Sequence, residues 1–374
     1  MNVLFVIDYY EHPNGGTEGQ LLELIRGLAR AGESPQLAVL RPSPFTREHG
    51  SSICPVSTLD VGRVLSLGTP IRLVRLAQFL RRERIDLVHV FFNDAALIVP
   101  VFAKLSGCRV VVSRRDMGLW YSPGKLLLAG MANRFVDRVI ANSRAVADHV
   151  VRHEKVAPSR VEVIYNGYSK SRMSPPAQPD LRERLGIGKD DPIVGMVANL
   201  RPVKRPADAI QAFAKAHQDH PSAHLILVGE GEGTLEADLK ALAEKLGVGP
   251  FVHLLGSLAD VIPVVKHFHL GLLCSESEGF SNSLLEYMAC GVPPVATRVG
   301  GNEELIEDGE TGYLVTTGDV PALASKISAL IRDRSLCDRM GANARASVER
   351  FSIGAMVSAH LAAYKHLLAP GDRP

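Results

Sequence analysis

Two glutamates, Glu278 and Glu286, lie eight positions apart in a stretch rich in glycine, serine and asparagine. A carboxylate accepts hydrogen bonds from two neighbouring hydroxyl groups, so each glutamate is suited to holding a sugar or a ribose. Ser281 or Asn282 can cap the helix predicted to follow, whose free amides and positive dipole end would favour an anion. The alternative is that the two acids only complement that helix dipole. The surrounding Gly-Phe-Ser-Asn and Met-Ala-Cys-Gly-Val-Pro argue against it.

Three cations, Arg201, Lys204 and Arg205, stand within five residues in a loop that follows a predicted strand. Fixed cations stabilise the charge that develops on a diphosphate leaving group as a glycosidic bond breaks. The loop is therefore a candidate diphosphate site. The alternative is a solvated basic turn that binds no ligand.

Glycines mark two further predicted strand ends. Gly15 and Gly16 precede the first long helix, where free helix amides can bind phosphate, although a plain turn has the same pattern. The run Gly229–Gly233 lacks the spacing of a dinucleotide fingerprint, and its two acids would repel a pyrophosphate. We interpret this run as a turn beside a nucleotide base.

The elements that must position these residues alternate between short apolar strands and amphipathic helices. The first strand is predicted at Val3–Ile7, the alternation continues to Val161–Ile164, and a second series begins at Ile193. This alternation predicts α/β architecture, with two Rossmann-like doubly wound domains facing each other across a cleft. Ligands of such sheets bind at the carboxyl ends of the strands, where the motifs above are predicted to lie.

Composition and charge narrow the function classes. The 374 residues carry 42 Lys and Arg against 40 Asp and Glu, a net charge of +2 that gives no reason to expect a nucleic-acid partner. This balance conceals a basic N-terminal half. Residues 1–169 contain 21 basic and 15 acidic residues, and residues 170–374 contain 21 basic and 25 acidic residues. The start resembles no signal peptide and no apolar run could span a membrane, so we expect a cytoplasmic protein. Scattered His and Cys, and no Asp-x-Asp in the cleft loops, predict chemistry without a metal.

The stretch Ser277–Gly312 resembles the retaining glycosyltransferases of family 4, which have the two-domain GT-B fold. The resemblance covers almost the whole chain. It is carried by Glu278-Gly279-Phe280, Glu286, Met288-Ala289, Val295-Ala296-Thr297 and Gly300-Gly301, together with Gly15–Glu18, Val163–Gly167 and Leu227–Gly231.

The resemblance implies a division into domains. An N-terminal, acceptor-side domain would cover residues 1–169, a proline-rich linker 170–192, and a nucleotide-sugar-binding domain 193–352. The last helix, within 353–374, would return to the N-terminal domain. The helical pattern alone would allow it to stay with the second domain.

The resemblance also assigns roles to residues. Glu286 would hold the nucleotide ribose, and Glu278 would face the transferred sugar near the reacting carbon. The donor would further contact the residues Gly16, Gly229, Leu255, Phe280, Ser281 and Asn282. Thr17 and Glu18 would lie near the acceptor, and His89 is expected on the acceptor side unless it is a buried structural histidine.

Two positions depart from the family pattern. Asn199 stands where members usually carry an Arg, and Arg201 follows two residues later. Arg115 stands where members commonly carry a His that contacts the donor sugar. This arginine would favour an acidic or otherwise altered sugar, or it pairs with Asp116 and has no chemical role.

The expected reaction moves a hexose from a nucleotide diphosphate sugar, UDP- or GDP-linked, to a hydroxyl acceptor with retention and without a cofactor. Arg201 and Lys204 would stabilise the leaving group, whose diphosphate oxygen would take the acceptor proton. The alternatives are a GT-B nucleotide-sugar epimerase, a nicotinamide oxidoreductase and a catalytically silent nucleotide-sugar-binding module. The oxidoreductase lacks its fingerprint near the first strand.

The acceptor is expected to be a glycan or lipid-linked glycan of cell-surface polysaccharide or lipopolysaccharide biosynthesis. Basic and apolar side chains on two predicted helices support contact with an anionic membrane surface. An ordinary solvated helix is the alternative. The residues are Arg72, Arg75, Arg81, Arg82, Arg84, Lys125, Leu126, Leu127, Leu128, Met131, Arg134 and Arg138.

Overall fold

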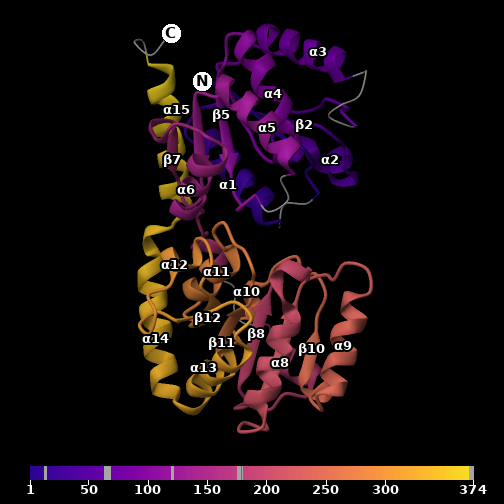
Figure 1. The fold of residues 1–374 in the computed structure, drawn as a ribbon, viewed down its shortest axis with the longest axis vertical. Helices are drawn as coiled ribbons and strands as arrows, with labels where there is room; N and C mark the ends of the chain where they lie inside the picture. The colour runs from indigo at the N-terminus through magenta and orange to yellow at the C-terminus, as the bar shows by residue number, and fades with distance from the viewer. Residues whose placement is uncertain (12–14, 63–68, 119–121, 175–177, 179, 370–374) are drawn as a thin grey trace. The chain divides into compact units, whose positions relative to one another are not determined.

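The computed structural model describes residues 1–11, 15–62, 69–118, 122–174, 178 and 180–369, and the chain divides into two compact units (Figure 1). Unit 1 consists of Met1–Gly167 together with Ile353–Pro374, and unit 2 of Tyr168–Ser352. Each unit contains one parallel sheet with helices on its faces. The predicted α/β class with two Rossmann-like domains is therefore confirmed.

Unit 1 is built on a seven-stranded sheet of order β3-β2-β1-β4-β5-β6-β7. Every pair is parallel, and β1 is buried from Val3 to Ile7 because apolar and β-branched residues fill both of its faces. The strand order reverses between β1 and β4, which makes their carboxyl ends a ligand-binding position. The strands are β1 Asn2–Ile7, β2 Ser34–Val39, β3 Val56–Thr58, β4 Leu87–Val90, β5 Arg109–Arg114, β6 Arg138–Ala141 and β7 Val161–Val163.

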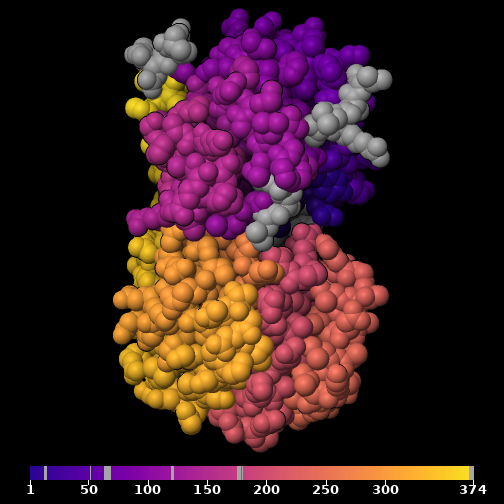
Figure 2. All heavy atoms as spheres, viewed as in Figure 1, coloured from indigo at the N-terminus to yellow at the C-terminus, as the bar shows by residue number. Residues whose placement is uncertain are grey.

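The last described helix of the chain, α15, completes the core of unit 1. Tyr364 of α15 is fully buried, and α15 packs on α1, where a Cβ atom added at Gly27 would lie 2.4 Å from a methyl of Val357. Figure 2 shows this yellow segment beside magenta segments that are far away in the sequence. The helices of unit 1 are α1 Gly16–Arg30, α2 Pro44–His49, η1 Gly50–Ser52, α3 Thr69–Arg82, α4 Asn93–Leu105, α5 Pro123–Ala132, η2 Asn133–Phe135, α6 Arg144–His153, η3 Pro158–Arg160 and α15 Ile353–Leu368.

Unit 2 is built on a six-stranded parallel sheet of order β10-β9-β8-β11-β12-β13. The strands are β8 Ile193–Val197, β9 His224–Val228, β10 Val252–Leu254, β11 Leu270–Leu273, β12 Pro294–Thr297 and β13 Tyr313–Val315. The helices are η4 Ser171–Met173, α7 Leu181–Leu185, η5 Pro202–Lys204, α8 Pro206–His217, α9 Leu235–Lys245, η6 Gly249–Phe251, α10 Ile262–Val265, α11 Asn282–Ala289, α12 Asn302–Leu305, α13 Val320–Arg332, α14 Arg334–Ser347 and η7 Val348–Arg350.

The segment 170–192, expected as a linker from its prolines, is part of unit 2. It contains η4 and α7, and Gln178 bonds to α10 through its backbone, donating to Pro263 O at 3.0 Å and accepting from His267 Nε2 at 2.8 Å. Pro175, Pro176 and Pro179 lie outside the described residues. The described residues of this segment therefore belong to unit 2 and contact α10.

No helix in the described part of the chain is both long and apolar enough to cross a membrane.

Candidate active site

Glu278 and Lys204 meet at the carboxyl edge of the unit 2 sheet. Glu278 lies in the loop between β11 and α11, and Lys204 lies in η5, just after β8, the strand next to β11. Glu278 Oε1 accepts hydrogen bonds from Lys204 Nζ and from Ser275 Oγ, both at 2.6 Å. The Glu278 side chain is 9% exposed and that of Lys204 25%, so the cation balances a carboxylate that water reaches poorly.

The backbone around Glu278 is fixed by two neighbouring loops. Glu276 N donates to Val203 O at 2.8 Å, which joins the Glu278 loop to η5. Gly301 N donates to Gly279 O at 3.0 Å from the other side. Gly300 has a φ of +51°, and a Cβ atom there would lie 1.8 Å from Glu278 O. Only glycine therefore allows this loop to pack against the backbone of Glu278.

Helix α11 is capped by Ser281 and fastened to the end of β8. Ser281 Oγ accepts from Leu284 N, so Ser281 is the cap and Asn282 is the first residue of the helix. Ser283 Oγ donates to Val197 O at 2.7 Å, and Val197 N donates to the Tyr287 hydroxyl at 2.5 Å. Phe280 is buried against Phe351 with their ring centroids 5.3 Å apart. These contacts hold the amino end of α11 beside Glu278.

Glu286 lies further along α11, and its side chain is 17% exposed. Burial raises its pKa to about 7, while the nearby Arg172 guanidinium acts to lower this pKa and the Asp260 carboxylate acts to raise it. Arg172 Nη1 lies 3.6 Å from Glu286 Oε1. Sequence reasoning missed Arg172 and Ser275, because no motif spacing links them to the two glutamates.

The other two cations of the Lys204 loop have different partners. Arg201 Nε lies 2.7 Å from Glu232 Oε1 in an ion pair whose side chains are both more than half exposed. Arg205 Nε donates to Asp208 Oδ2 at 2.7 Å. Exposed ion pairs contribute about 0–1 kcal/mol, so Arg201 can leave Glu232 for a phosphate at little cost. Asn199 is exposed in the same loop.

Gly229 brings the turn after β9 into contact with the loop after β8. Its φ is +138°, and a Cβ atom there would lie 1.8 Å from Ala198 O. Gly229 N donates to Gly256 O at 2.8 Å, next to the half-buried Leu255. The residues predicted to border the base therefore lie at the same sheet edge as Lys204.

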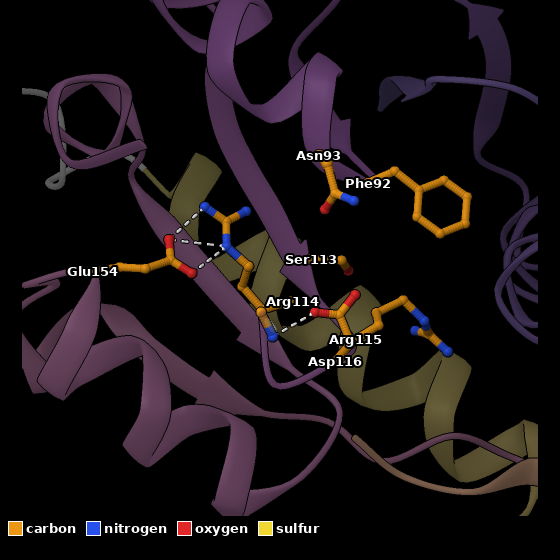
Figure 3. A pocket seen from close by; sticks show the side chains of 8 residues that line it. Phe92, Asn93, Ser113, Arg114, Arg115, Asp116 and Glu154 are labelled. Carbon is orange, nitrogen blue, oxygen red and sulfur yellow. Dashed lines mark hydrogen bonds and ion pairs between the residues drawn. The ribbon is translucent and has the colours of Figure 1, made fainter. Parts of the chain in front are cut away.

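Unit 1 has its own pocket at the carboxyl ends of β4 and β5 (Figure 3). Arg114 points to one side, where its guanidinium makes bidentate hydrogen bonds to the buried Glu154 at 2.7–3.0 Å. Arg115 leaves the strand end in another direction and donates to Asn166 Oδ1 at 2.6 Å. The residues that line the pocket are Phe92, Asn93, Ser113, Arg114, Arg115, Asp116, Gly118 and Glu154.

Arg115 is a poorly solvated cation. Burial lowers its pKa to about 10, and its Nε is buried without a hydrogen-bond partner among the described residues. Within the same described part of the chain it makes no ion pair with Asp116, whose Oδ1 accepts from Gly118 N instead. The guanidinium therefore retains hydrogen-bonding capacity for a ligand.

His89 had two interpretations, an acceptor-side residue or a buried structural histidine, and the structure shows the second. The residue is fully buried in β4, where Nδ1 lies 2.5 Å from the Tyr364 hydroxyl and Nε2 lies 2.9 Å from Ser113 Oγ. Burial lowers its pKa well below the usual value, so the ring is neutral at pH 7. Nδ1 contacts α15 and Nε2 contacts the neighbouring strand β5, which leaves neither nitrogen for an acceptor.

Gly16, Thr17 and Glu18 form the first turn of α1. The Glu18 carboxylate folds back over Gly15, where a Cβ atom would lie 2.1 Å from Oε2, and it complements the helix dipole. One turn on, Gln20 exchanges two hydrogen bonds with the backbone of Gly167, at 2.8 and 2.9 Å. This contact ties α1 to the loop of Asn166, the partner of Arg115.

Among the described residues, no cluster of three or more His, Cys, Asp or Glu side chains could hold a metal ion. The acids and cations described above are instead arranged as ion pairs.

Known families match both parts of the chain. Residues 14–172 match the family described as Glycosyltransferase Family 4, and residues 177–347 match Glycosyl transferases group 1. The N-acetyl-alpha-D-glucosaminyl L-malate synthase of Bacillus anthracis is 32% identical over 308 residues, which cover 79% of this chain and 78% of the relative. The D-inositol 3-phosphate glycosyltransferase of Segniliparus rotundus is 29% identical over 239 residues, 63% of this chain and 53% of that protein.

Solved structures show the same architecture. The crystal structure of Anabaena Alr3699/HepE in complex with UDP aligns with a TM-score of 0.87 and 26% identity, over 98% of this chain and all of that chain. The same protein in complex with UDP-glucose aligns with a TM-score of 0.82, over 97% of this chain and all of that chain.

Proposed function

The chain belongs to the glycosyltransferases of the GT-B fold that join a Family 4 part to a group 1 part, and we propose that it transfers a hexose from a UDP-sugar. The observation that carries this proposal is the Glu278–Lys204 pair at the carboxyl edge of the unit 2 sheet. The pair lies at the start of α11, and the second acid, Glu286, lies further along the same helix. The complexes of HepE with UDP and UDP-glucose support the choice of nucleotide.

In the proposed complex, each charged group meets one part of the donor. Glu286 accepts hydrogen bonds from the two ribose hydroxyls. Lys204 lies where the diphosphate leaves, and Arg201 joins it after releasing Glu232. Glu278 orients the transferred sugar with the carboxylate oxygen that Lys204 and Ser275 leave open.

We further propose that the reaction proceeds with retention and without a metal ion. In this proposal Glu278 orients the sugar and Glu286 holds the ribose, so neither carboxylate acts as a covalent nucleophile. The acceptor hydroxyl then attacks from the face that the diphosphate leaves, through an oxocarbenium-like state. A diphosphate oxygen takes the acceptor proton, and the two cations stabilise the negative charge that develops there.

The proposed acceptor is a glycan or lipid-linked glycan of cell-surface polysaccharide or lipopolysaccharide biosynthesis. Among the described residues, most exposed large apolar side chains lie on α3, at the end of α4 and on α5, and α4 packs against both α3 and α5. They are Ile71, Val74, Leu105, Leu127, Leu128 and Met131, and exposed arginines such as Arg75, Arg81 and Arg82 accompany them. Apolar groups flanked by cations suit an anionic membrane surface, so the proposed location is the cytoplasmic face of a membrane.

A small anionic acceptor is the second candidate. Arg115 supports it, because its buried Nε, beside a pocket of unit 1, has no hydrogen-bond partner in the part of the chain that the structure describes. The names of two relatives, which mention L-malate and D-inositol 3-phosphate, fit an acidic acceptor as well.

Thermal shift with a panel of nucleotide sugars tests the donor. A ligand at 100 times its Kd stabilises the folded state by about 2.7 kcal/mol, so a UDP-hexose should raise the Tm by several degrees. Glu286→Ala should abolish most of that shift. A wild-type protein that no nucleotide sugar stabilises would contradict the proposal. Transfer to lipid-linked glycans in liposomes, compared with transfer to small hydroxy acids and sugar phosphates, then separates the two acceptor classes.

A further inference from the structure

Arg172 lies between two acids at the proposed ribose site, and no role described above uses it. Its Nη1 lies 3.6 Å from Glu286 Oε1, and its Nη2 lies 3.4 Å from Asp260 Oδ1. The arginine belongs to η4 and Asp260 to the turn before α10, so three separate segments of unit 2 meet at this guanidinium.

Contacts on each side of Arg172 hold it in place. Lys266 Nζ, at the end of α10, donates to Met173 O at 2.7 Å. The Met173 sulfur lies 3.7 Å from the Cys290 thiol at the end of α11. Asp260 is fixed in turn, because its Oδ1 accepts from Ile262 N at 3.1 Å. The arrangement is thus built into the packing of η4 against α10 and α11.

The electrostatic roles of the two neighbours are opposite. Arg172 favours the charged form of Glu286, whereas Asp260 disfavours it. The remaining titratable groups beside Glu286 are Cys290 and Tyr287, and burial raises the pKa of both, that of Cys290 to about 11, so they are neutral near pH 7. Lys266 faces Cys290 and adds a cation one helical turn further along. Arg172 is therefore the cation nearest to Glu286 within the described part of unit 2.

We propose that Arg172 is a positioning residue for the donor nucleotide, which keeps Glu286 ionised and oriented to accept both ribose hydroxyls, and that Asp260 limits this effect. The inference rests on the proposed function, in which Glu286 binds the ribose. An ionised carboxylate accepts hydrogen bonds from both hydroxyls, one at each oxygen. In the protonated form one oxygen carries a proton and acts as a donor. Arg172 is 47% exposed, so it can adjust when the nucleotide enters.

The sign of the pH effect follows from this arrangement. Ribose affinity is present when Glu286 is ionised and is lost as the pH falls through its pKa. Removing Arg172 raises that pKa, so Arg172→Gln should lose affinity at a higher pH than wild type. Removing the charge of Asp260 lowers the pKa of Glu286, so Asp260→Asn should keep its ribose affinity down to a lower pH than wild type. A purely structural role of the ion pairs would not shift the two variants in opposite directions.

The experiment measures the Kd of UDP by calorimetry between pH 5.5 and 8.5. Because the pKa of Glu286 is about 7, Arg172→Gln should raise the pH midpoint by about half a unit to one unit and weaken binding about two- to fivefold near pH 7. Arg172→Lys should restore most of the UDP affinity. The affinity for 2′,3′-dideoxy-UDP, which lacks the two ribose hydroxyls, should be the same in wild type, Arg172→Gln and Asp260→Asn. The matched control is Arg184→Gln, since Arg184 is a similarly exposed arginine of unit 2 paired with Asp180 at 3.7 Å. This control should behave as wild type.

The failures of the two proposals are distinguishable. If Glu286→Ala leaves UDP affinity unchanged at every pH, the ribose assignment and this inference fall together. If Glu286→Ala weakens binding but Arg172→Gln matches Arg184→Gln, the inference falls and the proposed function stands. Carbon-13 NMR of the Glu286 carboxyl in the ligand-free protein gives a second measurement. An unchanged titration midpoint in Arg172→Gln overturns the inference without reference to any nucleotide.

Discussion

Gly300→Ala should damage activity more than its effect on folding accounts for. A Cβ atom at Gly300 would lie 1.8 Å from the Glu278 carbonyl oxygen, whereas such contacts are about 3 Å at their closest. The Glu278 backbone would have to move by about 1.2 Å. The side chain that orients the donor sugar moves with it, away from Lys204 and Ser275.

Gly309→Ala provides the matched control. Gly309 has a φ of +86° and Gly300 a φ of +51°, so alanine is strained at both, at about 1–2 kcal/mol. Apart from Gly309 and its two chain neighbours, no atom of the described residues lies within 4 Å of a Cβ built at Gly309. A loss of 1 kcal/mol lowers the Tm of a domain of this size by about 2–4 °C. The control should show that loss and no more.

The activity difference carries the test. A misplacement of about 1 Å at a reacting centre costs about 100-fold in rate, so Gly300→Ala should lower kcat by about that factor. Gly309→Ala should keep wild-type kcat. UDP release from the stabilising UDP-sugar measures the rate, and urea unfolding measures stability. Equal kcat values in the two variants would refute the placement of Glu278 at the reacting sugar.

Three further predictions concern single side chains. Lys204→Met leaves Glu278 with Ser275 as its described partner and should cost about 2–3 kcal/mol in urea unfolding. This is less than the roughly 3–5 kcal/mol of a fully buried pair, because Lys204 is partly exposed. An unchanged midpoint would contradict the buried-pair interpretation. Glu286→Gln should stabilise the protein at pH 8 and not below pH 4.5, because burial raises the pKa of Glu286 to about 7 and the wild type loses stability between those values as this acid ionises. Thermal melts at both pH values check this, and an equal gain at the two would refute the assignment. Arg115→Gln should change stability by less than about 1 kcal/mol, since Gln can still donate to Asn166. It should lower kcat/KM about tenfold for an acidic sugar or acceptor relative to a neutral one, and an unchanged ratio would exclude Arg115 from specificity.

The placement of the Glu278 and Lys204 loops at the carboxyl edge of a parallel sheet could be predicted, because the loops after parallel strands lie at one sheet edge. The ion pair between the two side chains was not predicted. Residue type narrowed the cap of α11 to Ser281 or Asn282, and the structure shows that Ser281 is the cap. These inferences need only local patterns and the geometry of parallel sheets. They do not depend on which side chains pair across the loops.

Pairings between distant side chains were beyond such reasoning. Arg201 has the charge expected of a phosphate ligand, yet it meets Glu232 of the turn after β9. A histidine near a strand end has the same local sequence pattern whether it is buried or exposed. His89 is buried because α15 covers it and places the Tyr364 hydroxyl against its ring. The prolines of 170–192 indicated a linker because composition does not record that Gln178 bonds to α10.

The position of α15 in unit 1 has a consequence for synthesis on the ribosome. Residues 1–167 leave the exit tunnel first, but the surface of α1 around Gly27 is covered only when Val357 and Tyr364 have been made. Unit 2 lies between residue 167 and α15 in the chain. At roughly 5–20 residues per second, its translation takes about 10 s or more. During that interval unit 2 can fold while the nascent first unit still exposes an apolar strip. We therefore expect ribosome-bound chains that stop before Ile353 to recruit chaperones to α1, and chains that include α15 to release them.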